Sequence, residues 1–230
     1  MTTTTATPEH AFGWPHRRID LDDWNDVYVV GDVHGCPDAL DALLDRLALA
    51  EDDLVVFVGD LIRKGPGSRA VIERVRTSDR MLSVRGNNEQ KLIDGDVSLP
   101  SLGPTAYRYL EELPIAISWE GGLVVHGGVD PSRPPSAHDP EELLTMRSAG
   151  DGSGYDGPFW FDRYEGPPRV FFGHTVLERP VDREWAVGLD TGCVYGGALT
   201  AYDVHAERFL SVRTDEHVPR PPEKIVSPEP

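Results

Sequence analysis

Residues 31–35 carry the first pair of side chains whose types and spacing suggest chemistry, Asp32 and His34. An apolar run over residues 27–30 comes directly before them and predicts a buried strand. A strand that ends there presents a carboxylate oxygen and an imidazole nitrogen side by side, and both suit a divalent cation. An isolated Asp-x-His pair is more often incidental than a ligand pair. The prediction of a metal site therefore depends on the side chains at the ends of the later strands.

Side chains of matching types recur at the ends of four later apolar runs, namely Asp60, Asn87, His126 and His174. Six such groups exceed the needs of a four-ligand, one-ion site, so two ions that share a bridging carboxylate fit better, with Asp60 as the bridge. Two ions about 3.5–4 Å apart can hold a phosphoryl oxygen and lower the pKa of water toward ~7, which supplies a hydroxide nucleophile. The residues thus predict phosphoryl-transfer chemistry.

The elements that must position these groups alternate between strand and helix in the first half of the chain. Apolar runs predict strands over 27–31, 54–58 and 81–84, and helical spacing of apolar residues predicts helices over 37–49 and 68–77. This order predicts parallel pairing with right-handed crossovers. Ligand sites in such sheets gather at the carboxyl ends of the strands, where the polar groups stand.

The second half of the chain has a different pattern. It predicts a hairpin over 115–119 and 123–125, a long loop over 130–168 with a short helix near 140–147, a strand over 170–172, and closing antiparallel strands over 185–189, 197–203 and 208–212. We expect an irregular N-terminal segment over 1–25, one domain over 26–213, and a Pro-rich, disordered tail over 214–230.

Composition narrows the function classes. The formal net charge of −17 over 230 residues argues against binding to nucleic acid or to an anionic membrane, because both need basic patches. No apolar stretch approaches 18 residues and the N-terminus lacks the pattern of a signal peptide, so we expect a cytoplasmic protein. The two cysteines, Cys36 and Cys193, are too few for a disulfide framework and are expected to be reduced.

Five motifs stand in the order used by calcineurin-like metallophosphoesterases, and the chain most resembles their phosphoprotein phosphatase family. The motifs are Gly31-Asp32-Val33-His34-Gly35, Gly59-Asp60-Leu61-Ile62-Arg63-Lys64-Gly65, Arg85-Gly86-Asn87-Asn88-Glu89, His126-Gly127-Gly128 and Gly173-His174-Thr175. Residues 188–200 resemble the bacterial branch near symmetrical diadenosine tetraphosphatases. The resemblance covers about residues 27–204. It implies an α/β fold, an αββα sandwich of two mixed β-sheets flanked by helices, with a dinuclear site between the sheets.

The resemblance also implies roles for single residues. Asp32 and His34 would bind the first ion, Asp60 would bridge, and the second ion would take Asn87, His126 and His174. Arg85 and Lys64 match positions that hold substrate phosphate, and Arg147 is a further candidate for such a contact. Mn²⁺ is the favoured metal on ligand type, with Fe or Zn as alternatives.

The chain departs from the family pattern at two positions. Asn88 stands where the family has a His, and Arg63 stands where it has an Asp; in the family those two pair, and the His is thought to protonate the leaving oxygen. A carboxamide cannot transfer a proton near neutral pH. Arg63 could instead stabilise a negative leaving group. The departure favours anhydrides and activated esters as substrates over phosphoserine.

Several alternatives stay open from the sequence. The substrate can be a dinucleoside polyphosphate or a serine/threonine phosphoprotein. The rival to an enzyme is a catalytically weakened pseudo-phosphatase that binds phosphate or a nucleotide, and retention of every metal ligand speaks against it. A one-metal nuclease is disfavoured by the acidic surface. The oligomeric state is not predicted.

Other candidates have a structural explanation that we prefer. His138 and His205 could replace the missing acid, but surface histidines are the better interpretation. Tyr155, Trp160 and Phe161 could stack on a nucleobase, although loop aromatics more often anchor a loop by packing. Glu89 is expected to support the site without binding metal, and Asp190 is expected to shape a turn.

Overall fold

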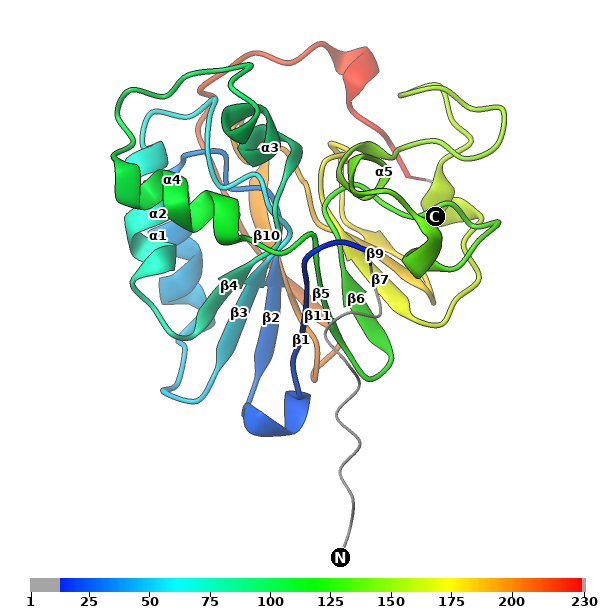
Figure 1. Cartoon of the computed structure of the whole chain (residues 1–230), viewed down its shortest axis with the longest axis horizontal. Helices are drawn as coiled ribbons and strands as arrows, with labels where there is room; N and C mark the ends of the chain where they lie inside the picture. The colour runs from blue at the N-terminus through cyan, green and yellow to red at the C-terminus, as the bar shows by residue number, and fades with distance from the viewer. Residues whose placement is uncertain (1–12, 229–230) are drawn as a thin grey trace, which may run out of the picture.

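The computed structural model describes residues 13–228, which fold into two facing β-sheets with helices outside them (Figure 1). The first sheet has the strand order β11-β10-β2-β3-β4. Its strands are β2 (Val27–Val30), β3 (Leu54–Phe57), β4 (Met81–Ser83), β10 (Ala198–Asp203) and β11 (Arg208–Arg213). The pairs β2–β3 and β3–β4 are parallel, as predicted, whereas β10 runs antiparallel to β2 and β11.

The second sheet has the strand order β1-β5-β6-β7-β9-β8. Its strands are β1 (His16–Arg18), β5 (Ala116–Trp119), β6 (Gly122–Val124), β7 (Arg169–Phe172), β8 (Val181–Asp182) and β9 (Ala186–Gly188). The antiparallel pair β5–β6 confirms the predicted hairpin. The prediction of an antiparallel strand at 185–189 is wrong with respect to β7, because β9 lies parallel to it.

Alternation along the strands explains why two sheets stack. In β2, Val27 and Val29 enter the core between the sheets, where they join Phe171 of β7, while Tyr28 and Val30 face the helices. Every residue of β2 is buried, which accounts for the continuous apolar run. The same core holds Trp119 and Phe171 with ring centroids 5.3 Å apart. The sheets therefore share one apolar core.

Helices cover the two outer faces unequally. The first sheet packs against α1 (Pro37–Leu47), α2 (Ser68–Arg76) and α4 (Pro104–Glu112). The second sheet is covered by α5 (Pro140–Thr145) and the long loop around it, whose Trp160 and Phe161 are buried in that core. The αββα sandwich is confirmed, although loop makes up much of its fourth layer. Helices α3 (Asn87–Ile93) and α4 were not predicted from the sequence.

The structure corrects the prediction for the N-terminal segment. Residues 1–12 lie outside the described residues, but β1 and a 3₁₀ turn at Leu21–Asp23 follow, so the segment expected to be irregular holds a strand. β1 pairs in parallel with β5 and is only three residues long. Its stability comes from backbone pairing with a strand 100 residues away (His16 with Ala116), which no local pattern predicts.

The prediction of a disordered tail is also wrong for the described part of the tail, residues 214–228. A 3₁₀ turn forms at Pro222–Lys224, and isolated bridges pair Tyr195 with Glu216 and Leu177 with Val226. These pairings connect the tail to loops at the carboxyl ends of the strands. No helix among residues 13–228 is long and apolar enough to span a bilayer.

The loop layer contributes strongly to stability through Trp160. Its side chain is fully buried, its Nε1 donates to the Gly127 carbonyl at 3.1 Å, and its ring packs on Phe172 at 4.8 Å. Trp160→Ala is expected to lower the free energy of unfolding by about 3–5 kcal/mol, measured by urea denaturation. Trp185→Ala, at a partly exposed Trp, is the control and should cost clearly less. Equal losses in the two variants would contradict this account.

Candidate metal centre

Asp32, His34 and Asp60 meet where β2 and β3 end. His34 Nε2 lies 3.7 Å from Asp32 Oδ2 and 3.6 Å from Asp60 Oδ2. One ligand atom from each residue lies within 4.8 Å of the other two, and all three side chains are buried. Among residues 13–228, neither carboxylate has a Lys or Arg ion-pair partner within 4 Å. Two buried carboxylates beside an imidazole fit a divalent cation in both ligand type and charge.

A second group of expected ligands lies on the other side of Asp60. The Asn87 side-chain oxygen is 3.0 Å from His126 Nε2 and 2.9 Å from His174 Nδ1. His126 Nε2 is also 3.4 Å from Asp60 Oδ1. The two oxygens of Asp60 therefore face the two groups separately, with Oδ2 toward His34 and Oδ1 toward His126. All six side chains converge, and Asp60 has the position that a bridging carboxylate needs.

The backbone at the site is held in an uncommon conformation. His34, Asp60 and His174 have φ angles of 51°, 52° and 63°, in the left-handed region that residues other than glycine rarely adopt. Such conformations cost free energy and concentrate at functional sites. Gly173 precedes His174, and a Cβ there would lie 2.0 Å from Asp32 Oδ1. The glycine of the fifth motif is therefore required by close approach to the first ligand pair.

Burial and mutual charge perturb the carboxylates. Burial and the neighbouring Asp190 raise the pKa of Asp32. Burial would also raise the pKa of Asp60, but His126 and His34 hold it well below its usual range. Burial would lower the pKa of His126, yet Asp60 outweighs it and raises this pKa to about 9. Burial thus brings carboxylates close together that repel one another, and a bound cation would relieve that repulsion.

Glu89 supports the site through the backbone. Its fully buried carboxylate accepts hydrogen bonds from the amides of Asp60 at 2.8 Å, Ile62 at 3.2 Å and Gly86 at 2.8 Å. These bonds fix the turns that present Asp60 and Asn87. The position agrees with the supporting role expected from the sequence.

Glu89→Gln is expected to weaken Mn²⁺ affinity by about 10–100-fold, because an amide NH₂ then faces backbone donors and the turns loosen. Titration calorimetry with Mn²⁺ measures the change. Glu112→Gln, at an exposed carboxylate, is the matched control and should leave the affinity unchanged. An unaltered affinity in Glu89→Gln would remove the supporting role.

The two departures from the family pattern touch each other. Arg63 Nη1 donates to the side-chain oxygen of Asn88 at 2.7 Å. The Asn88 amide nitrogen donates in turn to Asp60 Oδ2. Arg63 and Asn88 therefore form a pair of their own at the bridging carboxylate, and neither can donate a proton as an acid near neutral pH.

The three expected phosphate contacts lie in different places. Lys64 Nζ is 2.6 Å from His34 Nε2, and Arg147 donates from Nη2 to the His174 carbonyl at 3.4 Å, so both lie beside the cluster. The Arg85 guanidinium instead donates to the carbonyls of Glu111 at 2.7 Å and Leu113 at 3.2 Å. The structure thus does not bring this guanidinium to the ligands.

Arg85 does line a cavity of about 750 Å³ that the ligand Asn87 also lines. The cavity wall includes Thr145, whose carbonyl oxygen lies 3.1 Å from His174 Nε2. This cavity therefore adjoins the second group of ligands. It gives Arg85 a position beside the site without a contact to it.

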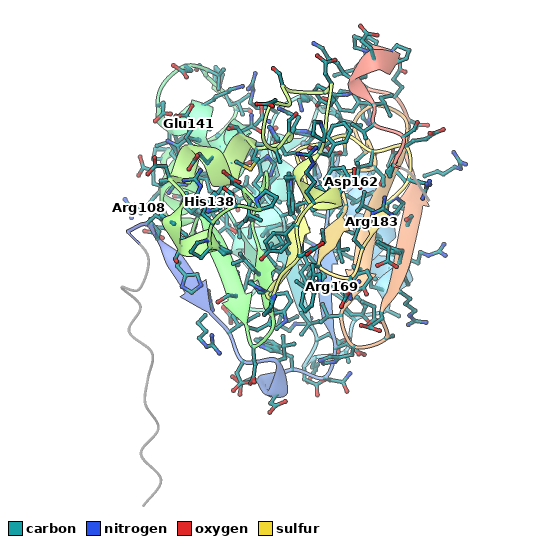
Figure 2. All side chains as sticks on the ribbon, turned by 90° about the vertical axis from the view of Figure 1, so that its right-hand side faces the viewer. Arg108, His138, Glu141, Asp162, Arg169 and Arg183 are labelled. Carbon is teal, nitrogen blue, oxygen red and sulfur yellow. The ribbon has the colours of Figure 1, made fainter. Side chains whose placement is uncertain are left out.

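The other candidates have structural roles. His138 is buried, which corrects the expectation of a surface residue, and its Nε2 accepts from the Asp130 amide at 2.6 Å (Figure 2). His205 contacts the Asn25 carbonyl, just before β2 begins, so it lies at the amino end of that strand, whereas Asp32 follows its carboxyl end. Trp160 and Phe161 are fully packed in the core and anchor the loop, which is the role expected from the sequence in preference to stacking on a nucleobase. Both cysteines are free and buried.

Sequence reasoning missed two residues at the site. Arg220 comes from the tail expected to be disordered, and Tyr195 was part of a motif but had no assigned role. Tyr195 packs edge-on against His34 with ring centroids 6.3 Å apart, and Arg220 lies over the Tyr195 ring at 4.7 Å. No motif marks Arg220; a Pro-flanked Arg was the single local signal. Asp190 shapes a turn as expected, accepting from the Gly192 amide at 3.1 Å.

The fold and the six converging side chains define a metal-dependent phosphoesterase scaffold. The chain belongs to the calcineurin-like phosphoesterases, whose family model matches residues 26–189. This confirms the resemblance read from the motifs and the hydrolase class that it implies.

Relatives of two kinds are similar to the chain. The asymmetrical bis(5'-nucleosyl)-tetraphosphatase PrpE of Geobacillus thermodenitrificans is 30% identical, over 86% of this chain and 98% of the relative. Serine/threonine-protein phosphatase 1 of Salmonella typhimurium is 30% identical, over 80% and 94%. A solved structure described as a proposed diadenosine tetraphosphatase matches with a TM-score of 0.79 and 31% identity, over 87% of this chain and 98% of the other. Symmetrical tetraphosphatases are also among the relatives.

Proposed function

We propose that the protein is a dinuclear-metal-dependent phosphoesterase that hydrolyses phosphoanhydrides or activated phosphate esters. The convergence of six ligand-type side chains around Asp60 carries this proposal. Asp32, His34 and Asp60 would hold one divalent ion, and Asp60, Asn87, His126 and His174 a second. Mn²⁺ is the favoured ion, with Fe or Zn as alternatives. Bound ions supply Lewis-acid activation of the phosphoryl group and a lowered pKa for water.

The protein's own groups orient the substrate around that centre. Lys64, beside His34, and Arg147, beside His174, are proposed to hold oxygens of the scissile phosphate. Arg147 can do so with two parallel hydrogen bonds and Lys64 with a point charge. Arg85 can join them only by leaving its carbonyl partners, so we give it a secondary role.

The absence of an acid sets the proposed substrate class. The Asn88 amide contacts Asp60 where the family has an imidazole, so a leaving oxygen would depart without a protein-donated proton. A departing nucleotide phosphate tolerates this better than a serine alkoxide. We therefore favour dinucleoside polyphosphates over phosphoproteins, and the tetraphosphatase relatives support this choice. A cytoplasmic location fits such a substrate and stays a prediction.

One observation favours a second candidate, a pseudo-phosphatase that binds phosphate or nucleotide. The Arg63–Asn88 pair occupies the position of the family's acid and could have ended turnover. Assays with Mn²⁺ on diadenosine tetraphosphate, p-nitrophenyl phosphate and a phosphoserine peptide separate the candidates. We expect hydrolysis of the first two and little of the third. Binding without hydrolysis of any of the three would refute the enzyme and favour the binding module.

A further inference from the structure

The chain returns to the site after its last strand. We call residues 214–228 the C-terminal segment; in Figure 1 it passes over the top of the molecule toward the half that holds α5. At one end the His217 amide donates to the Val194 carbonyl at 3.0 Å. At the other the Val226 amide donates to the Val176 carbonyl at 2.8 Å. One anchor follows Asp190 in the chain and the other follows His174, so the segment is tied to two loops of the candidate site.

Arg220 lies between these anchors and is held from several sides. Its Nε donates to the Lys224 carbonyl at 2.8 Å, within the turn at Pro222–Lys224, and its Nη2 donates to the Tyr155 hydroxyl. The guanidinium carbon is 4.7 Å from the Tyr195 ring centroid and 5.4 Å from that of Tyr155. Its Nη1 has no hydrogen-bond partner among residues 13–228. The guanidinium is thus held in one position, and its Nη1 can still donate a hydrogen bond to a ligand.

Two tyrosines connect Arg220 to the cations beside the proposed ligands. The Arg147 guanidinium carbon lies 4.8 Å from the centroid of the Tyr155 ring, which Arg220 also contacts. Lys64 Nζ lies 5.3 Å from the centroid of the Tyr195 ring, the other ring that Arg220 contacts. Three cations and two rings therefore form one continuous array. Its ends reach His34 through Lys64 and His174 through Arg147.

The buried Asp190 interacts electrostatically with Lys64 and Arg220, but no carboxylate of the described residues forms an ion pair with the array. Acidic residues outnumber basic ones by 39 to 22, and several arginines elsewhere pair with them. On the outer face, Arg169 contacts Asp182 at 2.8 Å and Arg183 contacts Asp162 at 3.2 Å (Figure 2). In the described part of the chain, Lys64, Arg147 and Arg220 form no ion pair within 4 Å. Three unpaired cations at one edge of a protein of net charge −17 are available to an anion from outside.

We propose that the C-terminal segment is a wall of the substrate site and that Arg220 binds the phosphate next to the scissile one. The inference rests on the proposed function and deepens it: the site would take a chain of two or more phosphates. A single phosphate is already provided for by Lys64, Arg147 and the metal centre. Arg220 lies between the two tyrosines in the middle of the array, and a third cation there needs a second anionic group. A guanidinium edge matches phosphate oxygens.

The test compares a single phosphate with a phosphate chain by titration calorimetry of the Mn²⁺-loaded protein. The ligands are inorganic phosphate and the β,γ-methylene analogue of ATP. Arg220→Ala is expected to weaken binding of the analogue by about tenfold or more, since a charge-assisted contact is lost. Binding of inorganic phosphate should weaken far less. Arg220→Lys keeps the positive charge but loses the planar guanidinium that can donate two parallel hydrogen bonds. Its affinity for the analogue should lie between those of Arg220→Ala and the unaltered protein.

Arg213→Ala is the matched control, because Arg213 is exposed at the end of β11 and lies outside the array. It should leave both affinities unchanged. An equal loss for both ligands in Arg220→Ala, or no loss for either, would overturn the proposal. Turnover does not enter this comparison, so a protein that fails to hydrolyse any substrate would refute the proposed function without deciding the role of Arg220.

Discussion

Asp60→Asn is expected to abolish hydrolysis of p-nitrophenyl phosphate. The loss of kcat should exceed the roughly 100-fold loss that is the most expected when a residue only supports a metal ligand. The physical reason is the position of the carboxylate between the two ligand groups. Its Oδ2 faces His34 at 3.6 Å and its Oδ1 faces His126 at 3.4 Å. An amide offers one oxygen in place of two and no negative charge, so it can neither bridge two cations nor balance them.

The control for this variant is a second buried aspartate on the same sheet. Asp203 is 1% exposed and ends β10 beside the amino end of β2, away from the site, where its carboxylate accepts from Ala206 and Arg208. Asp203→Asn should reduce stability and leave Mn²⁺ binding and kcat intact. The account would be contradicted if Asp60→Asn kept more than a tenth of the kcat, or if both variants lost activity to the same degree.

The second large expected effect is a gain of activity on a phosphoserine substrate. Restoring the family pair with Asn88→His and Arg63→Asp together is expected to raise kcat/KM on a phosphoserine peptide by about 100-fold or more, the usual range for general acid catalysis. On p-nitrophenyl phosphate the change should be small, because a nitrophenolate leaves without a proton. A series of phosphate esters with increasing leaving-group pKa measures the difference as a slope of log kcat/KM.

The structure explains why both substitutions are needed. Arg63 contacts position 88 directly, and a guanidinium at 2.7 Å from that side chain would lower the pKa of an introduced imidazole. An Asp at position 63 would raise it and favour the protonated acid. Arg63 also has a φ of 71°, which Asp tolerates well. The single variant Asn88→His is thus the control with a smaller gain. Equal slopes in the original and doubly substituted proteins would eliminate the argument about the missing acid.

The local part of the fold was predictable from sequence because its signals are local. The run Val27–Val30 is apolar because β2 is buried on both faces, and Asp32 comes next because the strand ends at the site. Helix α1 was predictable from the spacing of its leucines and from a first-turn Pro37. The convergence of six ligand-type residues was predictable because such groups gather at strand ends.

The features that the sequence did not reveal depend on contacts between distant segments. β1 exists through its pairing with β5, and the tail is ordered through its contacts with residues 176–178 and 194–197. Neither segment has an apolar periodicity of its own. Arg85 belongs to a motif, yet its guanidinium is directed to Glu111 and Leu113 by the position of α4, which was not predicted. Motifs therefore located the site, while packing determined which cations line it.

The most direct test is an anomalous difference map from crystals grown with Mn²⁺. The account predicts two peaks that share Asp60, one contacted by Asp32 and His34 and the other by Asn87, His126 and His174. A single peak, or manganese bound away from these six side chains, would contradict the dinuclear centre on which the proposed activity depends.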